Sequence, residues 1–162
     1  MTEAEQTALM QTQATQAQGL DYLRRILLAP VYDVAVETAL TPMSKLSSRL
    51  GNQIFLKRED QQPVHSFKLR GAYNKLSNLT EQQCLYGVIA ASAGNHAQGL
   101  ALAAHKLGIK ATIVMPITTP DIKVDNVRRY GAEVRLVGKS FNEAQQASMA
   151  YAEAEKRPRH SC

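Results

Sequence analysis

The sequence predicts an α/β fold in which βαβ units build a parallel sheet. Short runs of consecutive apolar residues, typical of strands buried on both faces, alternate with longer segments of helical periodicity. The composition is that of a globular domain, since 44% of the 162 residues are hydrophobic and 20% are charged. The expected strands are 54–56, 87–91, 111–115 and 134–137, and the expected helices are 22–28, 67–76, 95–107, 121–130 and 140–155.

Composition also excludes several classes of protein. No apolar run approaches the roughly 18 residues of a membrane helix, and the acidic Glu3 and Glu5 do not suit a secretory signal. Two cysteines, Cys84 and Cys162, are too few for a disulfide framework, so we expect a cytoplasmic protein. The net charge of +5 permits anionic ligands. With only 6% aromatic residues and no basic–aromatic interleaving, we expect no nucleic-acid partner.

The first elements are a polar arm and a short helix. Residues 1–17 are rich in Gln, Thr and Ala and lack apolar periodicity, which indicates a mobile arm, with a frayed helix as the alternative. In the helix expected over 22–28, Leu23, Ile26 and Leu27 share one face. Ala29 ends this helix because a residue that precedes proline is disfavoured in the helical conformation.

The central elements read as strand, helix and strand. In the helix over 67–76 we expect Phe67, Ala72, Tyr73 and Leu76 to face the core. The following strand leads into the helix over 95–107, which is rich in alanine and glycine. The next strand, over 111–115, is continuously apolar and is closed by Pro116.

The last two helices carry recognisable end signals. Gly131 suits the position just after the helix over 121–130, and Ser140 with Glu143 three residues later forms a capping-box pattern. The basic tail 157–162 has three interpretations: a solvated end, an arm for an anionic partner, or the end of a truncated chain.

Lys68 is the first candidate for chemistry. Ser66 is a suitable helix N-cap, which places Lys68 in the first turn, where the helix dipole disfavours a positive charge. Nearby cations at Lys57, Arg58 and Arg70 act in the same direction, and a neutral amine is what Schiff-base chemistry requires. On spacing alone, a solvated surface lysine is the favoured alternative.

The second candidate is the turn between the strand over 87–91 and the next helix. Gly94 permits a tight turn, and the free N–H groups of the following helix form an anion site. Ser92 and Asn95 add hydrogen-bonding side chains at the carboxyl edge of the sheet, where α/β proteins bind ligands. A simple turn with an asparagine cap explains the same residues equally well.

Other site types find little support. His65, His96, His105 and His160 show no metal-ligand spacing, so we expect no metal site. A G-x-S-x-G nucleophile motif, a G-x-G-x-x-G fingerprint and a P-loop are absent from the sequence, so nucleotide binding is weakly supported.

Taken together, the two candidate regions resemble motifs of a known family. The segment 63–73, Pro-Val-His-Ser-Phe-Lys-Leu-Arg-Gly-Ala-Tyr, is similar to the cofactor-lysine motif of the fold-type II pyridoxal-phosphate enzymes. The segment 92–99, Ser-Ala-Gly-Asn-His-Ala-Gln-Gly, is similar to their second motif. The likeness is strongest to the threonine dehydratase (threonine ammonia-lyase) family, and covers about residues 20–156. It favours the biosynthetic branch, since in the catabolic branch a Thr-Gly precedes the Ser-Phe-Lys.

The resemblance implies roles for individual residues. Lys68 would form the Schiff base with pyridoxal 5′-phosphate, Phe67 would pack near the cofactor ring, and Asn95 would hydrogen-bond the ring oxygen. The substrate carboxylate would be held by the loop Ser92, Ala93, Gly94, Asn95 and His96.

The implied architecture is the tryptophan synthase β-like fold, here truncated. It divides the chain into the arm 1–17, leading elements of the large domain over 18–65, the small cofactor-side domain over 66–156 and a non-family tail over 157–162. The glycine-rich loop for the cofactor phosphate, the group facing the pyridine nitrogen and the regulatory domain would lie beyond the last residue.

The implied activity is that of a lyase in isoleucine biosynthesis, which removes water from L-threonine to give 2-oxobutanoate and ammonia. L-serine is a second possible substrate, and the full-length protein is expected to be a homo-oligomer. The alternative is a catalytically inert fragment or interaction module, since exposed sheet edges and a former interface favour association.

Overall fold

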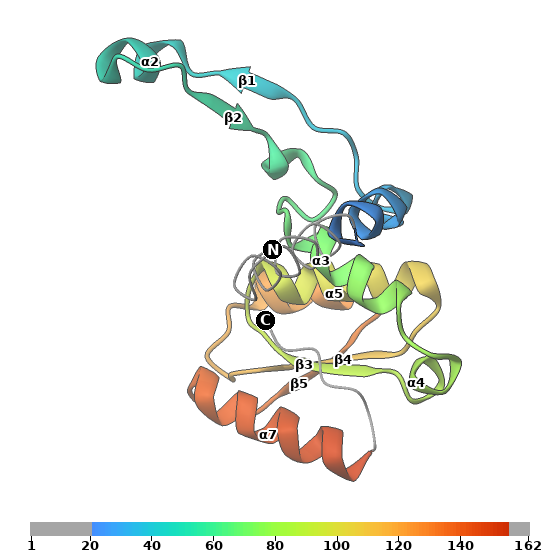
Figure 1. Cartoon of the computed structure of the whole chain (residues 1–162). Helices are drawn as coiled ribbons and strands as arrows, with labels where there is room; N and C mark the ends of the chain where they lie inside the picture. Colours follow the sequence, from blue (N-terminus) through green and yellow to red (C-terminus); the bar gives the residue numbers. More distant parts are fainter. Residues whose placement is uncertain (1–20, 156–162) are drawn as a thin grey trace, which may run out of the picture. The chain divides into compact units, whose positions relative to one another are not determined.

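The computed structural model describes residues 21–155 (Figure 1). The predicted arm 1–17 and the tail 157–162 lie outside the described residues. The chain divides at Pro30 into two units. In the first, residues 21–28 form the expected helix, but the face shared by Leu23, Ile26 and Leu27 is exposed.

The second unit is organised around the predicted parallel sheet. Its three strands are β3 (Val88–Ala91), β4 (Ala111–Met115) and β5 (Glu133–Leu136), in the order β3-β4-β5. Ile89 pairs with Thr112, and Ile113 pairs with Val134, both in parallel register. The α/β class with a parallel sheet is therefore confirmed, with strand ends within one residue of those expected.

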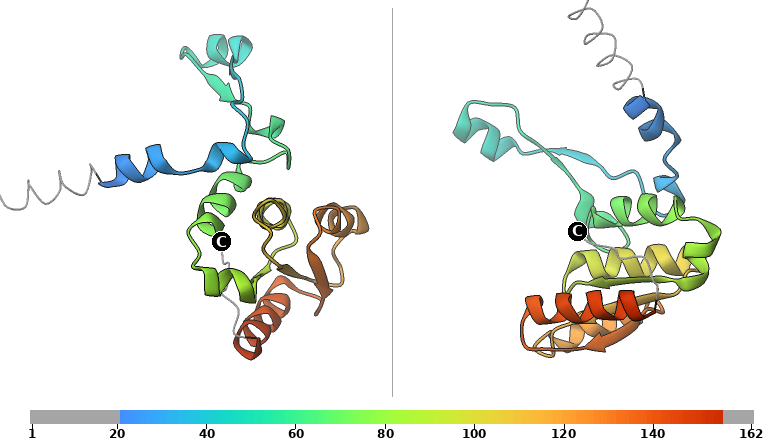
Figure 2. Two further views of the ribbon diagram at one scale, coloured as in Figure 1. Left: turned by 90° about the vertical axis from the view of Figure 1, so that its right-hand side faces the viewer. Right: turned by 60° about the horizontal axis from the view of Figure 1, so that its bottom comes forward.

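Helices cover both faces of this sheet (Figures 1 and 2). The helices α3 (Lys68–Ser77), α5 (Asn95–Leu107) and α6 (Asp121–Arg128) share one core with alternate strand residues, including Val88 and Ile113. On the other face, α7 (Phe141–Ala154) packs on Ile89 and Val114. Because both faces are buried, these strands read as continuous apolar runs in the sequence.

The helix ends follow the predicted signals in two of three cases. Ser140 and Glu143 form the expected capping box of α7, and Gly131 follows α6 with φ of +79°. At α3 the prediction of Ser66 as N-cap is wrong by one residue. The N-cap is Phe67, and the Ser66 hydroxyl accepts a hydrogen bond from the Lys68 N–H at 3.2 Å.

Phe67 is also misassigned to the core, since 59% of it is exposed. The inward position at the start of α3 belongs instead to Leu69, which is fully buried and lies on the same helix face as Ala72 and Leu76.

A second, two-stranded sheet was only partly predicted. The strand β1 (Leu40–Pro42) pairs antiparallel with β2 (Phe55–Lys57), and α2 (Ser44–Leu50) lies between them in sequence. Only β2 was expected, and as part of the parallel arrangement. β1 and α2 contain no buried residue, so neither carries an apolar pattern that the sequence could show.

Three further short helical segments were not predicted: α4 (Glu81–Tyr86) and the 3₁₀ turns η1 (Val31–Asp33) and η2 (Glu59–Gln61). A capping box between Thr80 and Gln83 begins α4 and was available as a signal. Among residues 21–155, no helix combines the length and apolar character needed to cross a bilayer.

Candidate active site

The first candidate residue, Lys68, is the first residue of α3. Its side chain is half-buried, and its Nζ lies 5.6 Å from the centre of the Phe67 ring. Ser66, which accepts from the Lys68 N–H, is only 5% exposed. The segment before the helix is therefore fixed to the protein, and Lys68 is not the fully solvated surface lysine that spacing alone favoured.

The second candidate region joins β3 to α5. Ser92 is 7% exposed, and its hydroxyl accepts a hydrogen bond from the Gly94 N–H at 3.4 Å. Gly94 is the N-cap of α5 and makes no side-chain capping bond, so the asparagine-cap interpretation is wrong. Asn95 is instead the first helical residue, and its side chain is exposed. The positive end of the α5 dipole faces the carboxyl edge of β3, which suits a carboxylate.

The structure brings these two regions together through α3 and α5. A Cβ built on Gly99 would lie 3.1 Å from the carbonyl carbon of Lys68 and 3.0 Å from the amide nitrogen of Leu69. The two helices can approach this closely only because position 99 lacks a side chain. The start of α3 therefore lies against Gly99, which is one helical turn after Asn95, the first residue of α5.

His96 provides a second measure of this proximity. The pKa of the His96 imidazole is lowered, mainly by burial and in part by the positive charge of Lys68. Both effects favour the neutral ring. The charge of Lys68 therefore acts on His96, a residue in the first turn of α5.

A polar cluster beside this site was not found from the sequence. The Glu59 carboxylate accepts hydrogen bonds from Arg70, Gln62 and Thr38. The Arg70 guanidinium holds the pKa of Glu59 at about 2. The sequence identified Arg70 only as a cation near Lys68, because no periodic pattern pairs residues 11 positions apart across a loop.

The backbone before Lys68 contains one unusual conformation. His65 has φ of +53° and is the only non-glycine residue with positive φ within residues 21–155. Its Nδ1 lies 3.1 Å from the carbonyl oxygen of Asp60, and its N–H donates to the Gln62 carbonyl at 2.7 Å. Non-glycine residues adopt this region at a cost, and such strain is frequent beside functional sites.

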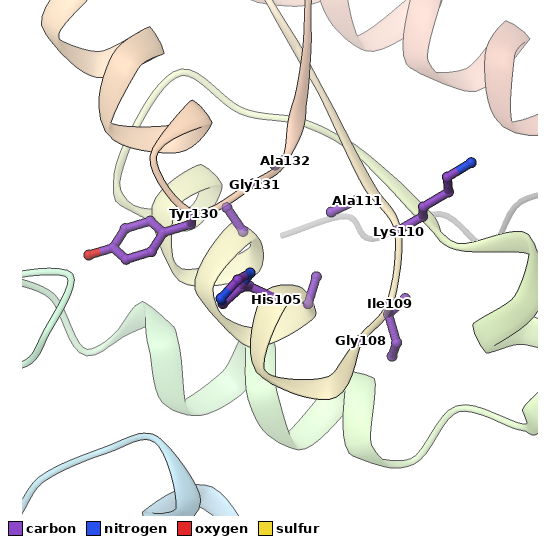
Figure 3. Close-up of a pocket in the computed structure, with 10 residues that line it drawn as sticks. His105, Gly108, Ile109, Lys110, Ala111, Tyr130, Gly131 and Ala132 are labelled. Atoms are coloured by element: carbon purple, nitrogen blue, oxygen red, sulfur yellow. The ribbon is translucent and has the colours of Figure 1, made fainter.

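A cavity of about 230 Å³ lies elsewhere, at the C-terminal end of α5 and the start of β4 (Figure 3). His105, Lys110 and Tyr130 contribute its polar lining. None of the predicted site residues lines it, and it opens at the end of α5 opposite to Gly94. Within the described range, no group of histidine, cysteine and acidic side chains is arranged to hold a metal ion.

Comparisons with known proteins agree on one family. The family model described as "Pyridoxal-phosphate dependent enzyme" matches residues 31–160. A protein of Escherichia coli (strain K12) named "L-threonine dehydratase biosynthetic IlvA" is 61% identical over 127 residues, which are 78% of this chain and 25% of that protein. "Threonine dehydratase 1 biosynthetic, chloroplastic" of Solanum lycopersicum is 58% identical over 139 residues, 86% of this chain and 23% of that protein.

A solved structure of a similarly named protein also matches this chain. The processed form of threonine deaminase isoform 2 from Solanum lycopersicum superposes with a TM-score of 0.84 at 53% identity, over 88% of this chain and 39% of that one. This chain spans about a quarter of the length of the curated relatives it matches.

The residues present suit part of the pyridoxal-phosphate molecule. The half-buried amine of Lys68 suits the aldehyde group, and the exposed face of the Phe67 ring beside it suits an aromatic ring. The buried Ser92 hydroxyl and the N-terminus of α5 suit an anionic carboxylate. The donor set therefore fits the aldehyde end of this cofactor together with an amino-acid substrate.

Proposed function

Because the chain belongs to the pyridoxal-phosphate dependent enzyme family, we propose that it carries the lysine-bearing part of an active site that removes water from L-threonine. Hydrolysis of the dehydrated product, which adds a water molecule back, would then give 2-oxobutanoate and ammonia, at the start of isoleucine synthesis. The observation that supports the proposal is the close approach of Gly99 to the Lys68–Leu69 peptide, which brings the start of the lysine helix against α5, the helix that follows the 92–94 turn.

Pyridoxal phosphate, when bound, acts as an electron sink for the pair released at the substrate's α-carbon. In this proposal the Lys68 amine would hold the cofactor, and after the substrate's amino group has replaced it there, the freed amine would accept the α-proton as general base. Both tasks need an uncharged amine.

The remaining site residues would bind and orient the substrate and the cofactor. We assign the substrate carboxylate to the loop Ser92, Ala93, Gly94, Asn95 and His96, where a helix N-terminus supplies N–H donors. Asn95, whose side chain is exposed at the start of α5, would hydrogen-bond the cofactor ring oxygen. Phe67, next to Lys68, would lie against the cofactor ring.

The proposal extends to the surroundings of the whole protein. The names of the relatives favour L-threonine as substrate, with L-serine as a second possibility. We propose a cytoplasmic protein that forms a homo-oligomer at full length. The division into leading elements over 18–65 and a cofactor-side domain over 66–156 stays a prediction.

A second candidate function is supported by a specific observation. Several large apolar side chains of the β1–α2–β2 segment are exposed, among them Leu40, Leu50 and Phe55. This favours an interaction module, or an inert fragment, when residues 1–162 stand alone.

One experiment separates the two candidates. The chain is incubated with pyridoxal phosphate, reduced with borohydride and mapped by mass spectrometry, while threonine turnover is followed in parallel. The enzyme proposal expects a reduced adduct at Lys68 and its loss in Lys68→Ala. Lys75→Ala is the matched control, since Lys75 is an exposed lysine at the other end of the same helix.

An adduct at Lys68 with turnover supports the enzyme, and an adduct without turnover supports the inert fragment. A folded chain whose lysines all react equally would overturn the assignment of Lys68.

A further inference from the structure

The Glu59 carboxylate is the centre of a polar cluster that the proposed mechanism does not use. It accepts from Arg70 Nε at 2.8 Å and Nη2 at 3.2 Å, from the Thr38 hydroxyl at 2.7 Å and from Gln62 Nε2 at 3.3 Å. Only 16% of the Glu59 side chain is exposed. A carboxylate with this many donors is held in one position.

Gln62 extends the cluster to a third segment of chain. It is 1% exposed, its Oε1 accepts from the Val36 N–H at 3.0 Å, and its Nε2 donates to the Val36 carbonyl at 2.9 Å. The same Nε2 donates to Glu59. The buried amide therefore fastens the residues before Lys68 to the segment that precedes β1.

The cluster links the two ends of the loop that leads into Lys68, the first residue of α3. Glu59 lies before the loop, in η2, and Arg70 lies after it, in the first turn of α3. The ion pair joins these two ends, and the Arg70 guanidinium also lies 5.2 Å from the Tyr32 ring of η1. Between the two ends the backbone passes through the strained His65 and the buried Ser66. A loop with a strained residue keeps its conformation only if its surroundings hold it.

We propose that Glu59 is a positioning residue for Lys68, and that its hydrogen bonds to Arg70 and Gln62 fix the start of α3 so that the lysine amine is directed at the cofactor aldehyde. This inference rests on the proposed function. Glu59 acts through Arg70 and Gln62, and its carboxylate forms its hydrogen bonds with those side chains and with Thr38. Because Arg70 lowers its pKa to about 2, Glu59 stays ionised throughout the neutral range.

The test compares Glu59→Gln with a matched control in the same 3₁₀ turn. Asp60→Asn also removes a carboxylate from a two-point arginine pair, since Asp60 accepts from Arg58 at 2.9 and 2.7 Å. The Asp60 side chain is 57% exposed, and the arginine it pairs with, Arg58, precedes η2 rather than belonging to α3. The two variants therefore differ in whether the broken pair reaches the Lys68 helix.

Two readouts are measured on the chain of residues 1–162. The first is the ratio of borohydride-trapped pyridoxal phosphate at Lys68 to that at Lys75. The second is amide hydrogen exchange of the peptide 62–70, with the β4 peptide 111–115 as internal reference. We expect Glu59→Gln to lower the trapping ratio at least fivefold and to speed exchange of 62–70 at least tenfold, with 111–115 unchanged. Asp60→Asn leaves both readouts at the wild-type level.

Equal trapping ratios in Glu59→Gln and wild type would overturn the proposal, as would faster exchange throughout the sheet, since that is general destabilisation. If Glu59→Gln does not fold, Arg70→Lys replaces it, because lysine keeps the charge but loses the two-point geometry. If wild type itself traps no cofactor at Lys68, the proposed function fails. The exchange comparison then still decides whether Glu59 holds the loop.

Discussion

Gly99 of α5 lies directly against the peptide bond between Lys68 and Leu69 at the start of α3. A Cβ at position 99 would approach the Lys68 carbonyl carbon to 3.1 Å and the Leu69 Cα to 3.3 Å. The atoms it would meet belong to helix backbone and cannot rotate away. The distance between α3 and α5 at this point is therefore set by the absence of one methyl group.

The first prediction concerns this contact. We expect Gly99→Ala to lower the free energy of unfolding by up to about 2 kcal/mol, because overpacking costs roughly 1–3 kcal/mol and the gain in helix propensity is about 1 kcal/mol. Urea unfolding measures the change. The matched control is Gly71→Ala in α3, where a Cβ meets no atom within 4 Å, so propensity alone should stabilise the protein by about 0.5–1 kcal/mol. If both substitutions changed the free energy of unfolding in the same direction, the close approach of Gly99 to α3 would be contradicted.

The second prediction concerns the strained backbone at His65. With φ of +53°, this position suits glycine. We expect His65→Gly to change the free energy of unfolding by less than about 1 kcal/mol, since relief of strain offsets the greater entropy of the unfolded glycine. His65→Val should lose about 1–3 kcal/mol, because a β-branched residue strongly resists positive φ. Thermal unfolding of the pair distinguishes them, and a stable valine variant would show that position 65 is extended.

The third prediction is a pH dependence. The Arg70 guanidinium lowers the pKa of folded Glu59 to about 2, from its ordinary value of 4.5. A carboxyl group with a lowered pKa stabilises the fold above its unfolded pKa, and this stabilisation disappears as the pH falls from 4.5 towards 2. Urea titrations at several pH values should show Glu59→Gln less stable than wild type at pH 7 by about 1–2 kcal/mol, after solvent screening is allowed for. The difference should shrink across that acidic window, and a constant difference would contradict the ion pair.

The fourth prediction uses His96 as a reporter of Lys68. Burial and the Lys68 charge both lower the pKa of His96, so Lys68→Ala should raise it part of the way to its ordinary value. Burial remains in the variant, so the recovery is incomplete. Because a lowered histidine pKa favours the neutral folded form, the His96 contribution to stability is present above the unfolded pKa and falls as the pH drops below it. NMR titration of the imidazole measures the shift, with Lys75→Ala as the unaffected control. An unchanged titration in Lys68→Ala would place the two groups apart.

The parts of the fold that the sequence predicted are those with a periodic apolar pattern. β4 is buried at every residue, and α5 alternates buried alanines and Gly99 with polar residues, so their bounds were predicted to the residue. Capping boxes work at the same short range, as at Ser140. β1 and α2 have no buried residue, so their sequences show no apolar periodicity that would predict them.

The candidate site divides in the same way. Lys68 and the loop 92–96 could be named from local motifs, because each consists of consecutive residues at an element boundary. The cluster around Glu59 could not, since its partners Thr38 and Arg70 lie 21 and 11 residues away on other segments. Phe67 was placed in the core by helical periodicity, although α3 starts one residue later and turns its first inward position to Leu69.

The sequence by itself determined the α/β class and the order of the main elements, because these depend on interactions between neighbours in the chain. Only the tertiary structure decided how close α3 comes to α5, which carboxylate meets Arg70 and why residue 65 is strained. Those features depend on how segments far apart in the sequence pack together, and the apolar pattern of the sequence does not give the distances between those segments.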